Sequence, residues 1–263
     1  TSGAEGQPAY ATGVRGTGLT FDGVNDYVCT GTTGTCADDA DLDVTGNLTV
    51  GAWVKLNSTN TGDSIISKWG ANQSSRQSWL LGHNIVGGAG IIDFFVSQTG
   101  DNVYATRPSS VTLSSGSWYF VIGVYNNSNQ TLNVYVNGVL SNGTLSGTVP
   151  SSLNNTSTSV TIGVDMDGNS SDSPTRPFDG TIDEPFVTAE ALTPSQIKHM
   201  YEVGKRALQN HTASRIVGVT GADNYQRLMG NASGGTSTSN NVGAVAVDDN
   251  NQFIYAGLND TSA

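Results

Sequence analysis

The sequence is poor in basic residues and in charge of either sign. Lys and Arg number 11 against 22 Asp and Glu, which gives a formal net charge of −11, and charged residues make up 13% of the chain. Such a surface repels the phosphate backbone, so we expect no nucleic-acid partner. An apolar run of about 18 residues is also missing, so we expect no membrane span in this chain. The chain starts at Thr1 without a basic and then apolar leader, which is typical of a processed chain or of a fragment.

Cysteine is scarce, and Cys29 and Cys36 are the two cysteines of the chain. The short segment of small residues between them allows the thiols to meet. We therefore expect a local disulfide, worth about 2.5 kcal/mol on the loop-entropy model. Metal binding by the two thiols is the weaker alternative. Because disulfides form in oxidising compartments, the pair indicates an extracellular or cell-surface location.

Motifs of several enzyme classes are missing as well. The sequence contains no Gly-x-Ser-x-Gly elbow and no phosphate-binding Gly-Lys-Ser/Thr. His83, His199 and His211 stand alone, with no second metal ligand or nucleophile at motif spacing. We interpret each of them as a surface or capping histidine.

Glycine and short apolar segments are abundant. The 33 Gly residues and the 36% hydrophobic content are typical of an all-β sandwich. In Leu48–Leu56 the aliphatic residues alternate with polar ones, and Trp53 with Lys55 falls on the second face, which predicts a half-buried strand. Further strands are predicted at Gly18–Gly23, Asp26–Val28, Ser64–Lys68, Ser78–Gly82, Ile91–Ser97, Val103–Thr106 and Ser159–Val164.

Two neighbouring segments predict an antiparallel meander. Trp118–Tyr125 is apolar at nearly every position, as in a central strand. Leu132–Val136 alternates and leads into Asn137-Gly138, the strongest two-residue hairpin signal.

One helix is predicted after these strands. Thr193 is the expected N-cap, Pro194 occupies the first helical position, and Gln196 completes a capping box. Gly204 is the expected end of the helix. Beyond it, residues 211–263 form a tail with a predicted strand at Arg215–Thr220 and an isolated hairpin at 242–256.

Several of these segments follow one another in a characteristic order. They are Leu19-Thr-Phe-Asp-Gly23, Leu48-Thr-Val-Gly-Ala-Trp-Val-Lys55, Gly116-Ser-Trp-Tyr119, Leu132-Asn-Val-Tyr-Val-Asn-Gly138, Phe178-Asp-Gly-Thr-Ile-Asp-Glu184 and Ala191-Leu-Thr-Pro-Ser-Gln-Ile197. The set resembles the laminin-G-like, concanavalin A-like jelly-roll family of secreted and cell-surface proteins. The resemblance implies an all-β fold, a two-sheet antiparallel jelly-roll sandwich with one short C-terminal helix over residues 1–210, followed by the β-rich tail.

One residue departs from the family pattern. Pro185 stands where the family continues with an apolar β-branched residue. Proline lacks the N–H that a ladder needs, so we expect the strand to be an edge strand or to be bulged there.

The resemblance also implies a structural calcium site. Asp183 corresponds to the acid that binds Ca²⁺ in the Ile-Asp-Glu strand of the family, with Asp22 nearby from the first strand. Since Ca²⁺ takes about six to eight oxygens, backbone carbonyls around residues 23–25 would complete the shell. The alternative is that both aspartates accept hydrogen bonds from turn N–H groups. A separate acidic segment lacks the Gly and Glu of an EF-hand and is interpreted as a solvated loop; its residues are Asp165, Asp167, Asn169 and Asp172.

The acidic pair Asp183 and Glu184 does not predict catalysis. Adjacent strand residues point to opposite faces, whereas a glycosidase needs two carboxylates across the scissile bond. Laminarinase-type relatives carry Glu-x-Asp-x-x-Glu on this strand, but Thr181 replaces the first Glu here and Val187 follows without an acid. We therefore expect no enzyme activity.

Sugar binding requires exposed aromatic faces on which a pyranose can stack. The candidates are Trp69, Trp79, Tyr104 and Tyr135, and Trp69, beside Gly70 in an expected loop, is the strongest. Core packing is the alternative for each of them.

Asn-x-Ser/Thr sequons are more frequent than the composition predicts. This indicates a glycoprotein, and the alternative is a compositional bias of the loops. The acceptor residues are Asn47, Asn57, Asn72, Asn126, Asn129, Asn142, Asn154, Asn155, Asn169, Asn210, Asn231 and Asn259.

Together these features favour a non-enzymatic extracellular module that binds glycan or protein and is stabilised by Ca²⁺. The alternative is a structural subunit of an extracellular filament or surface layer, in which residues 212–263 pair with a neighbouring subunit. A third interpretation is that the tail begins another β domain.

Overall fold

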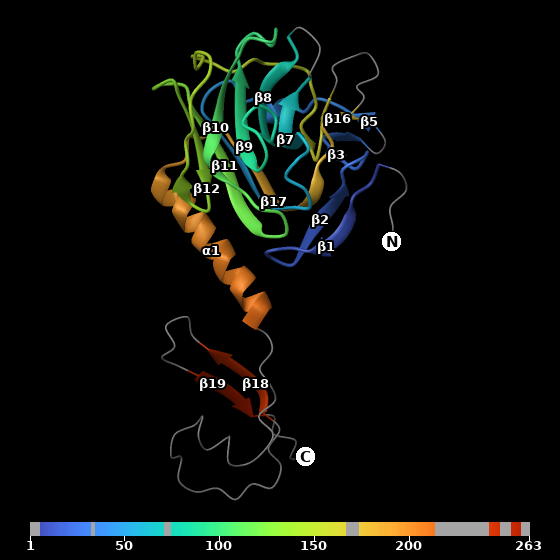
Figure 1. Cartoon of the computed structure of the whole chain (residues 1–263), viewed down its shortest axis with the longest axis vertical. Coiled ribbons are helices and arrows are strands. Elements are labelled where there is room, and N and C mark those ends of the chain that lie inside the picture. Colours follow the sequence, from blue (N-terminus) through green and yellow to red (C-terminus); the bar gives the residue numbers. More distant parts are fainter. Residues whose placement is uncertain are drawn as a thin grey trace, which may run out of the picture. The chain divides into compact units, whose positions relative to one another are not determined.

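The computed structural model describes residues 6–32, 35–70, 75–166 and 174–213 and the two strands at 242–247 and 254–258. The chain divides into two compact units, residues 1–208 and 209–263. The first unit is a sandwich of two antiparallel sheets (Figure 1), which confirms the predicted fold class. Of the tail, the structure describes β18 (Val242–Val247) and β19 (Ile254–Leu258), an antiparallel pair; the strand predicted at Arg215–Thr220 lies outside the described residues.

The larger sheet has seven strands. In spatial order they are β1 (Ala9–Thr12), β2 (Thr17–Asp22), β17 (Asp179–Thr188), β6 (Leu48–Leu56), β11 (Trp118–Asn126), β12 (Thr131–Val136) and β13 (Val139–Leu140). Strands β11, β12 and β13 pair antiparallel in sequence order, so the predicted meander is confirmed. Its turn places Asn137 at φ 52° and Gly138 at φ 76°, the left-handed conformations that a two-residue primed turn requires.

The smaller sheet has six strands. In spatial order they are β10 (Tyr104–Thr112), β9 (Ile91–Ser97), β8 (Gln77–His83), β7 (Asp63–Trp69), β14 (Thr161–Ile162) and β3 (Val28–Cys29). Short two-stranded pairs lie beside it: β4 (Gly31–Thr32) with β5 (Thr35–Cys36), and β15 (Asp165–Met166) with β16 (Pro174–Thr175). The predicted disulfide is present, joining Cys29 to Cys36 with Cα atoms 5.5 Å apart.

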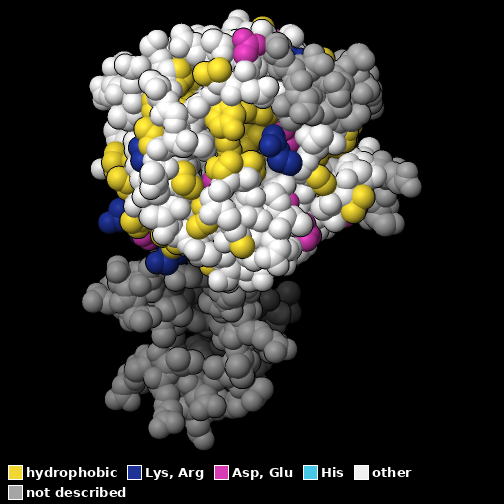
Figure 2. Space-filling model, turned by 45° about the horizontal axis from the view of Figure 1, so that its top comes forward, with side chains coloured by type: hydrophobic (Ala, Val, Ile, Leu, Met, Phe, Trp, Pro, Cys, Tyr) yellow, Lys and Arg dark blue, Asp and Glu magenta, His cyan; other side chains and the backbone are white. Residues whose placement is uncertain are grey.

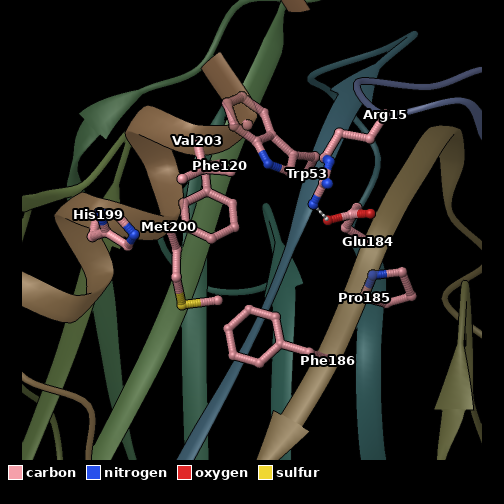
Figure 3. Close-up of a pocket in the computed structure, with 10 residues that line it drawn as sticks. Arg15, Trp53, Phe120, Glu184, Pro185, Phe186, His199, Met200 and Val203 are labelled. Carbon is pink, nitrogen blue, oxygen red and sulfur yellow. Dashed lines mark hydrogen bonds and ion pairs between the residues drawn. The ribbon is translucent and has the colours of Figure 1, made fainter. Parts of the chain in front are cut away.

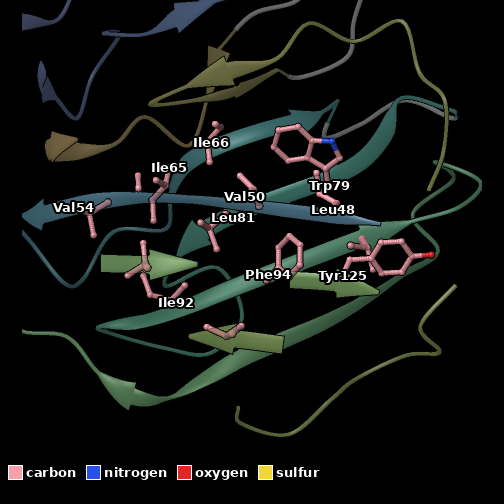
Figure 4. Packing of buried hydrophobic residues seen from close by; sticks show 14 of the residues in the cluster. Leu48, Val50, Val54, Ile65, Ile66, Trp79, Leu81, Ile92, Phe94 and Tyr125 are labelled. Atoms are coloured by element: carbon pink, nitrogen blue, oxygen red, sulfur yellow. The ribbon is translucent and has the colours of Figure 1, made fainter. Parts of the chain in front are cut away.

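The main core lies between the two sheets (Figure 4). Val50 and Val54 of β6 face Leu81 and Phe94 of the smaller sheet, and all four are fully buried. Trp79 is also fully buried in this cluster. The period-2 alternation of each strand thus supplies one face to a continuous apolar layer.

Strand β6 is not half-buried as its alternation predicted. Its second face is covered by helix α1 (Pro194–Ala213), and Trp53 is only 3% exposed. The indole of Trp53 stacks on the ring of Tyr201 with centroids 5.7 Å apart. Strand β6 therefore lies in a middle layer, with the smaller sheet on one side and helix α1, which follows much later in the chain, on the other.

The helix begins as predicted but continues past its predicted end. Thr193 N donates to Gln196 Oε1 over 2.8 Å, and Gln196 N donates to Thr193 Oγ1 over 3.3 Å, which confirms the capping box. Gly204 lies inside the helix, so the prediction of a C-terminal glycine was wrong. A Cβ atom at Gly204 would lie 2.6 Å from the indole of Trp53, so glycine here allows the close approach of helix and sheet.

Strand β17 is bulged at Pro185, as the sequence predicted. The register between β17 and β6 shifts between Asp183 and Phe186, and Glu184 adopts φ 48°. Pairing with β2 ends at Ile182, and Pro185 lies in the gap of the pairing with β6. The sheet therefore needs no hydrogen bond from the N–H that proline lacks.

A buried lysine ties the acidic segment after the disulfide to the smaller sheet. Lys68 is 1% exposed, and its Nζ lies 2.5 Å from Asp38 Oδ1 and 2.9 Å from Asp43 Oδ1. Nζ also donates to the carbonyl of Thr158 over 2.9 Å. The two aspartates compensate the cost of burying this charge.

Candidate functional site

Two of the four aromatic residues proposed for sugar stacking are buried. Trp79 is fully buried between the sheets, and Tyr135 is 4% exposed in the cluster that contains Trp53 and Ile197 beneath the helix. Neither ring is accessible to a ligand, so these two assignments are corrected. Core packing decides their positions because each side chain faces an apolar layer that the sequence alone did not locate.

The other two aromatic residues lie together on the outer face of the smaller sheet. Trp69 ends β7 rather than lying in a loop, and Tyr104 begins β10. Phe95 of β9 stands between them, and all three ring pairs have centroids 5.4–5.9 Å apart in tilted or edge-to-face geometry. Trp69 and Phe95 are each 4% exposed, whereas Tyr104 is 38% exposed. Tyr104 is therefore the ring that a ligand can cover.

These rings form one wall of a hollow of about 170 Å³, here named the Trp69 hollow. Its apolar lining is completed by Leu80, Ile85 and Val86, and its polar lining consists of Gln77, Asn102 and Arg176. Val86 is 54% exposed. Figure 2 shows a hollowed area in which hydrophobic side chains gather beside basic atoms.

Gln77 and Asn102 hold each other at the edge of the Trp69 hollow. Gln77 Nε2 donates to Asn102 Oδ1 over 2.7 Å, and Asn102 N donates to Gln77 Oε1 over 2.9 Å. Asn102 adopts φ 59°, a left-handed conformation that asparagine tolerates well. Within the described ranges, no hydrogen bond engages Asn102 Nδ2 or the Tyr104 hydroxyl, so both can bond to a ligand hydroxyl.

Arg176 forms a bidentate pair with Asp165. Arg176 Nε donates to Asp165 Oδ1 over 2.9 Å, and Nη2 donates to Oδ2. Asp165 is fully buried and also accepts from the hydroxyls of Ser64 and Thr175. Burial raises the pKa of Asp165, and the Arg176 guanidinium opposes that rise. The sequence interpretation of Asp165 as part of a solvated loop was wrong; Asp167, Asn169 and Asp172 lie outside the described residues.

A second buried carboxylate shapes the turn that lines the Trp69 hollow. Asp93 Oδ2 accepts from the N–H groups of Ile85, Val86 and Gly87 over 2.8–3.3 Å. Burial raises the pKa of Asp93, while these N–H groups oppose the rise. The fixed turn presents Ile85 and Val86 to the hollow.

The histidines are placed differently from the sequence interpretation. His83 is fully buried with Nδ1 3.8 Å from Asp63 Oδ2, so its assignment as a surface or capping residue was wrong. His199 is exposed on the helix. The side chain of His211 lies outside the described residues.

A larger cavity of about 490 Å³ lies between the helix and the seven-stranded sheet (Figure 3). Its floor is formed by Trp53 and Phe120, whose rings already pack on each other at 5.2 Å. At its mouth Arg15 Nη1 lies 3.4 Å from Glu184 Oε2. Because this cavity forms part of the interface that seats the helix, the Trp69 hollow is the better candidate despite its smaller volume.

The structure does not bring Asp22 and Asp183 together. Asp22 pairs with Asp179 across the sheet, and Asp183 lies further along β17, about 13 Å away at the usual rise per residue. Asp183 Oδ2 accepts from the N–H groups of Val14 and Arg15 over 2.7 and 2.9 Å. Asp22 Oδ1 accepts from two N–H groups of its own turn over 2.8 and 3.2 Å. The two aspartates therefore do not fit one shared calcium site.

Other acidic groups do not replace that pair. Within the described ranges, no three His, Cys, Asp or Glu side chains are arranged to hold a metal ion. Asp183 is buried, whereas Glu184 is exposed and pairs with Arg15. The two neighbours thus occupy different environments and do not form the carboxylate pair of a glycosidase.

The sequons divide by the hydrogen bonds of their asparagines. Asn142 Nδ2 donates to Asn133 Oδ1, and Asn154 Nδ2 donates to two carbonyls, so these amides take part in the fold. Asn129 and Asn155 are exposed. Asn47, Asn57 and Asn126 are also described, whereas Asn72, Asn169, Asn231, Asn259 and the side chain of Asn210 lie outside the described residues.

A comparison with family models assigns the chain. The model described as the concanavalin A-like lectin/glucanases superfamily matches residues 22–198, so the chain belongs to this superfamily. No curated protein matches the chain. Among the described residues, no helix is both long enough and apolar enough to cross a membrane.

Solved structures share the fold at low sequence identity. A heptameric SAP-like pentraxin from Limulus polyphemus has a TM-score of 0.50 and 19% identity, over 73% of this chain and 84% of that one. The CBM40 of the Ruminococcus gnavus IT-sialidase, bound to α2,3 sialyllactose, has a TM-score of 0.51 and 15% identity, over 66% and 97%. The binding domain of Paraclostridial Mosquitocidal Protein 1 has a TM-score of 0.53 and 12% identity, over 76% and 47%. These similarities show that the fold of the first unit, a sandwich of two antiparallel sheets, is shared with these proteins.

Proposed function

We propose that the first unit is a non-enzymatic module that binds a glycan in the Trp69 hollow. The observation that carries this proposal is the cluster of Trp69, Phe95 and Tyr104, which opens on the outer face of the sheet with Tyr104 38% exposed. Aromatic faces bind the apolar side of a sugar ring, and nearby donors then fix its hydroxyls. Asn102 Nδ2 and the Tyr104 hydroxyl supply such donors.

The experiment is a glycan array probed with the purified full chain, followed by titration of each ligand that binds. Wild-type protein is expected to retain a defined set of glycans, and Tyr104→Ala is expected to bind the same glycans more weakly. The matched control is Tyr10→Ala, because Tyr10 is 80% exposed on β1, away from the hollow. Binding that survives Tyr104→Ala unchanged would place the ligand elsewhere, and an array without any bound glycan would remove the proposal.

An extracellular or cell-surface location accompanies this function. The disulfide between Cys29 and Cys36 supports an oxidising compartment, and Asn129 and Asn155 present exposed sequons. Mass spectrometry of the natively produced protein tests both points, since glycan should be found at Asn129 or Asn155 and not at Asn142. A reduced protein without glycan contradicts this location.

Calcium is proposed separately, as a stabilising ion whose site is not the Asp22 and Asp183 pair. The test compares the melting temperature in excess CaCl₂ and in EDTA. A higher melting temperature with calcium supports a bound ion, and Asp183→Asn should keep that difference because N–H groups occupy its carboxylate. Equal melting temperatures would remove calcium from the proposal.

Self-assembly through residues 212–263 is a second proposal. Strands β18 and β19 pair with each other, and a two-stranded sheet leaves two edges that a further strand can join. Light scattering of the full chain and of a chain ending at residue 211 provides the test. The full chain should form particles that contain more chains than those of the truncated protein. An equal number of chains per particle in the two proteins would exclude assembly through the tail.

A further inference from the structure

The charge balance of the Trp69 hollow limits the chemistry of its ligand, and this inference rests on the proposed glycan-binding function. Arg176 is the one charged residue in the described lining. Both of its donors that face Asp165 are engaged, Nε to Oδ1 over 2.9 Å and Nη2 to Oδ2. A bidentate pair of this kind is electrically neutral and geometrically fixed.

The pair is also hard to separate. Asp165 is fully buried, and its carboxylate additionally accepts from Ser64 Oγ and Thr175 Oγ1 over 3.1 and 3.0 Å. If Arg176 turned to a ligand, it would leave a buried carboxylate without its countercharge, which is strongly unfavourable. The guanidinium therefore contributes hydrogen-bonding edges to the hollow but no free positive charge.

The remaining polar groups of the Trp69 hollow are neutral. Asn102 is held by Gln77, which leaves Asn102 Nδ2 as a donor, and Tyr104 adds a hydroxyl. The rest of the lining is apolar, so a carboxylate that entered would lose its hydration without gaining an ionic partner. The formal net charge of −11 adds a long-range repulsion of anions.

We infer that the Trp69 hollow takes the terminal ring of a neutral glycan and discriminates against rings that carry a carboxylate, such as sialic acid. The volume of about 170 Å³ is below the usual range for drug-sized ligands, which fits one sugar ring better than an extended chain. The apolar side of the ring covers Tyr104 and Val86, and its hydroxyls bond to Asn102 and Tyr104.

The experiment uses matched pairs of glycans, each neutral structure beside its sialylated form, with lactose and α2,3 sialyllactose as one pair. The full chain is titrated with both members at low and at physiological salt, with binding followed by ligand-observed NMR. For every pair that binds, the neutral member should bind at least about tenfold more tightly, the effect of about 1.4 kcal/mol. Equal or tighter binding of the sialylated member overturns this inference but leaves the glycan-binding function standing. If no glycan binds, the function itself fails.

A variant tests the physical cause. Asp165→Asn removes the countercharge of Arg176 and is expected to raise the affinity for the sialylated member, which narrows the difference within each pair. Ser64→Ala is the matched control, because it removes one hydrogen bond to Asp165 and leaves the ion pair. If folded Asp165→Asn keeps the wild-type ratio of affinities for the neutral and the sialylated glycan, the neutralised charge of Arg176 is not the cause of the discrimination. If Asp165→Asn does not fold, the wild-type ratio alone decides the inference.

Discussion

The ring of Tyr104 meets the indole of Trp69 edge to face with centroids 5.9 Å apart, although the two residues belong to strands at different positions in the sheet. Trp69 is almost covered, so it supports Tyr104 rather than facing the solvent. Tyr104 is therefore the residue that contacts a ligand, and Trp69 is the residue that holds Tyr104 in place.

Tyr104→Ala is expected to weaken glycan binding by about fivefold, because a stacked aromatic ring contributes about 1 kcal/mol. Tyr104 is partly exposed, so the free energy of unfolding should change little. Titration calorimetry and urea unfolding give the two quantities. Trp69→Ala should instead lower both the affinity for glycan and the free energy of unfolding. A stable Trp69→Ala protein with full affinity would contradict the role of Trp69 as the support of Tyr104.

Lys68→Met is expected to lower the free energy of unfolding by about 2 kcal/mol, because Asp38 and Asp43 would remain close together without a countercharge. The value is below that of a fully buried pair because the two aspartate side chains are 30% and 19% exposed. Urea unfolding measures the loss, and exposed Lys198→Met is the matched control. A loss no larger than that of the control would show that the triad of Lys68, Asp38 and Asp43 adds no stability.

Reduction of the disulfide is expected to lower the free energy of unfolding by about 2 kcal/mol while the sandwich stays folded. Cys29 and Cys36 close a short loop beside β3, outside the main core. Thermal unfolding of the paired Cys29→Ser and Cys36→Ser variant measures this effect. Because Asp38 follows the loop, the loss should not add to that of Lys68→Met, and strict additivity would show that the loop and the triad are independent.

Asp183→Asn is expected to lower the free energy of unfolding by about 1–2 kcal/mol, because Oδ2 accepts two N–H groups and Oδ1 accepts one. An amide keeps one acceptor and presents a donor to the other N–H groups. The matched control is exposed Glu184→Gln, which should have almost no effect. Equal stability of the two variants would contradict the structural role of Asp183.

Asp93 predicts a pH dependence. Burial raises its pKa above the ordinary 3.8, so between 3.8 and the raised value the folded chain binds the proton that the unfolded chain has released. The free energy of unfolding therefore falls as the pH rises through this window. Asp93→Asn should flatten that part of the curve of unfolding free energy against pH, because an amide does not titrate. The turn should stay in place, because the amide oxygen can still accept its N–H groups.

Urea unfolding at several values between about pH 4 and 7 measures this contribution. An Asp93→Asn curve with the full wild-type slope would contradict the assignment.

The sequence by itself determined the elements that depend on local rules. Alternation located the strands, Asn137-Gly138 fixed a hairpin, Thr193 and Gln196 fixed the start of the helix, and Pro185 marked the bulge. Each of these signals acts between near neighbours in the chain, so the residue types suffice to predict it.

The tertiary structure decided which side chains are available. The sequence offered Trp69, Trp79, Tyr104 and Tyr135 as sugar-stacking candidates without showing which of them are exposed, yet two lie in cores and two lie at one hollow. The tertiary structure also decided that Asp165 is buried and paired with Arg176, and this ion pair sets the charge of that hollow. Exposure and pairing depend on which strands and which helix cover each face, and those contacts join residues far apart in the chain.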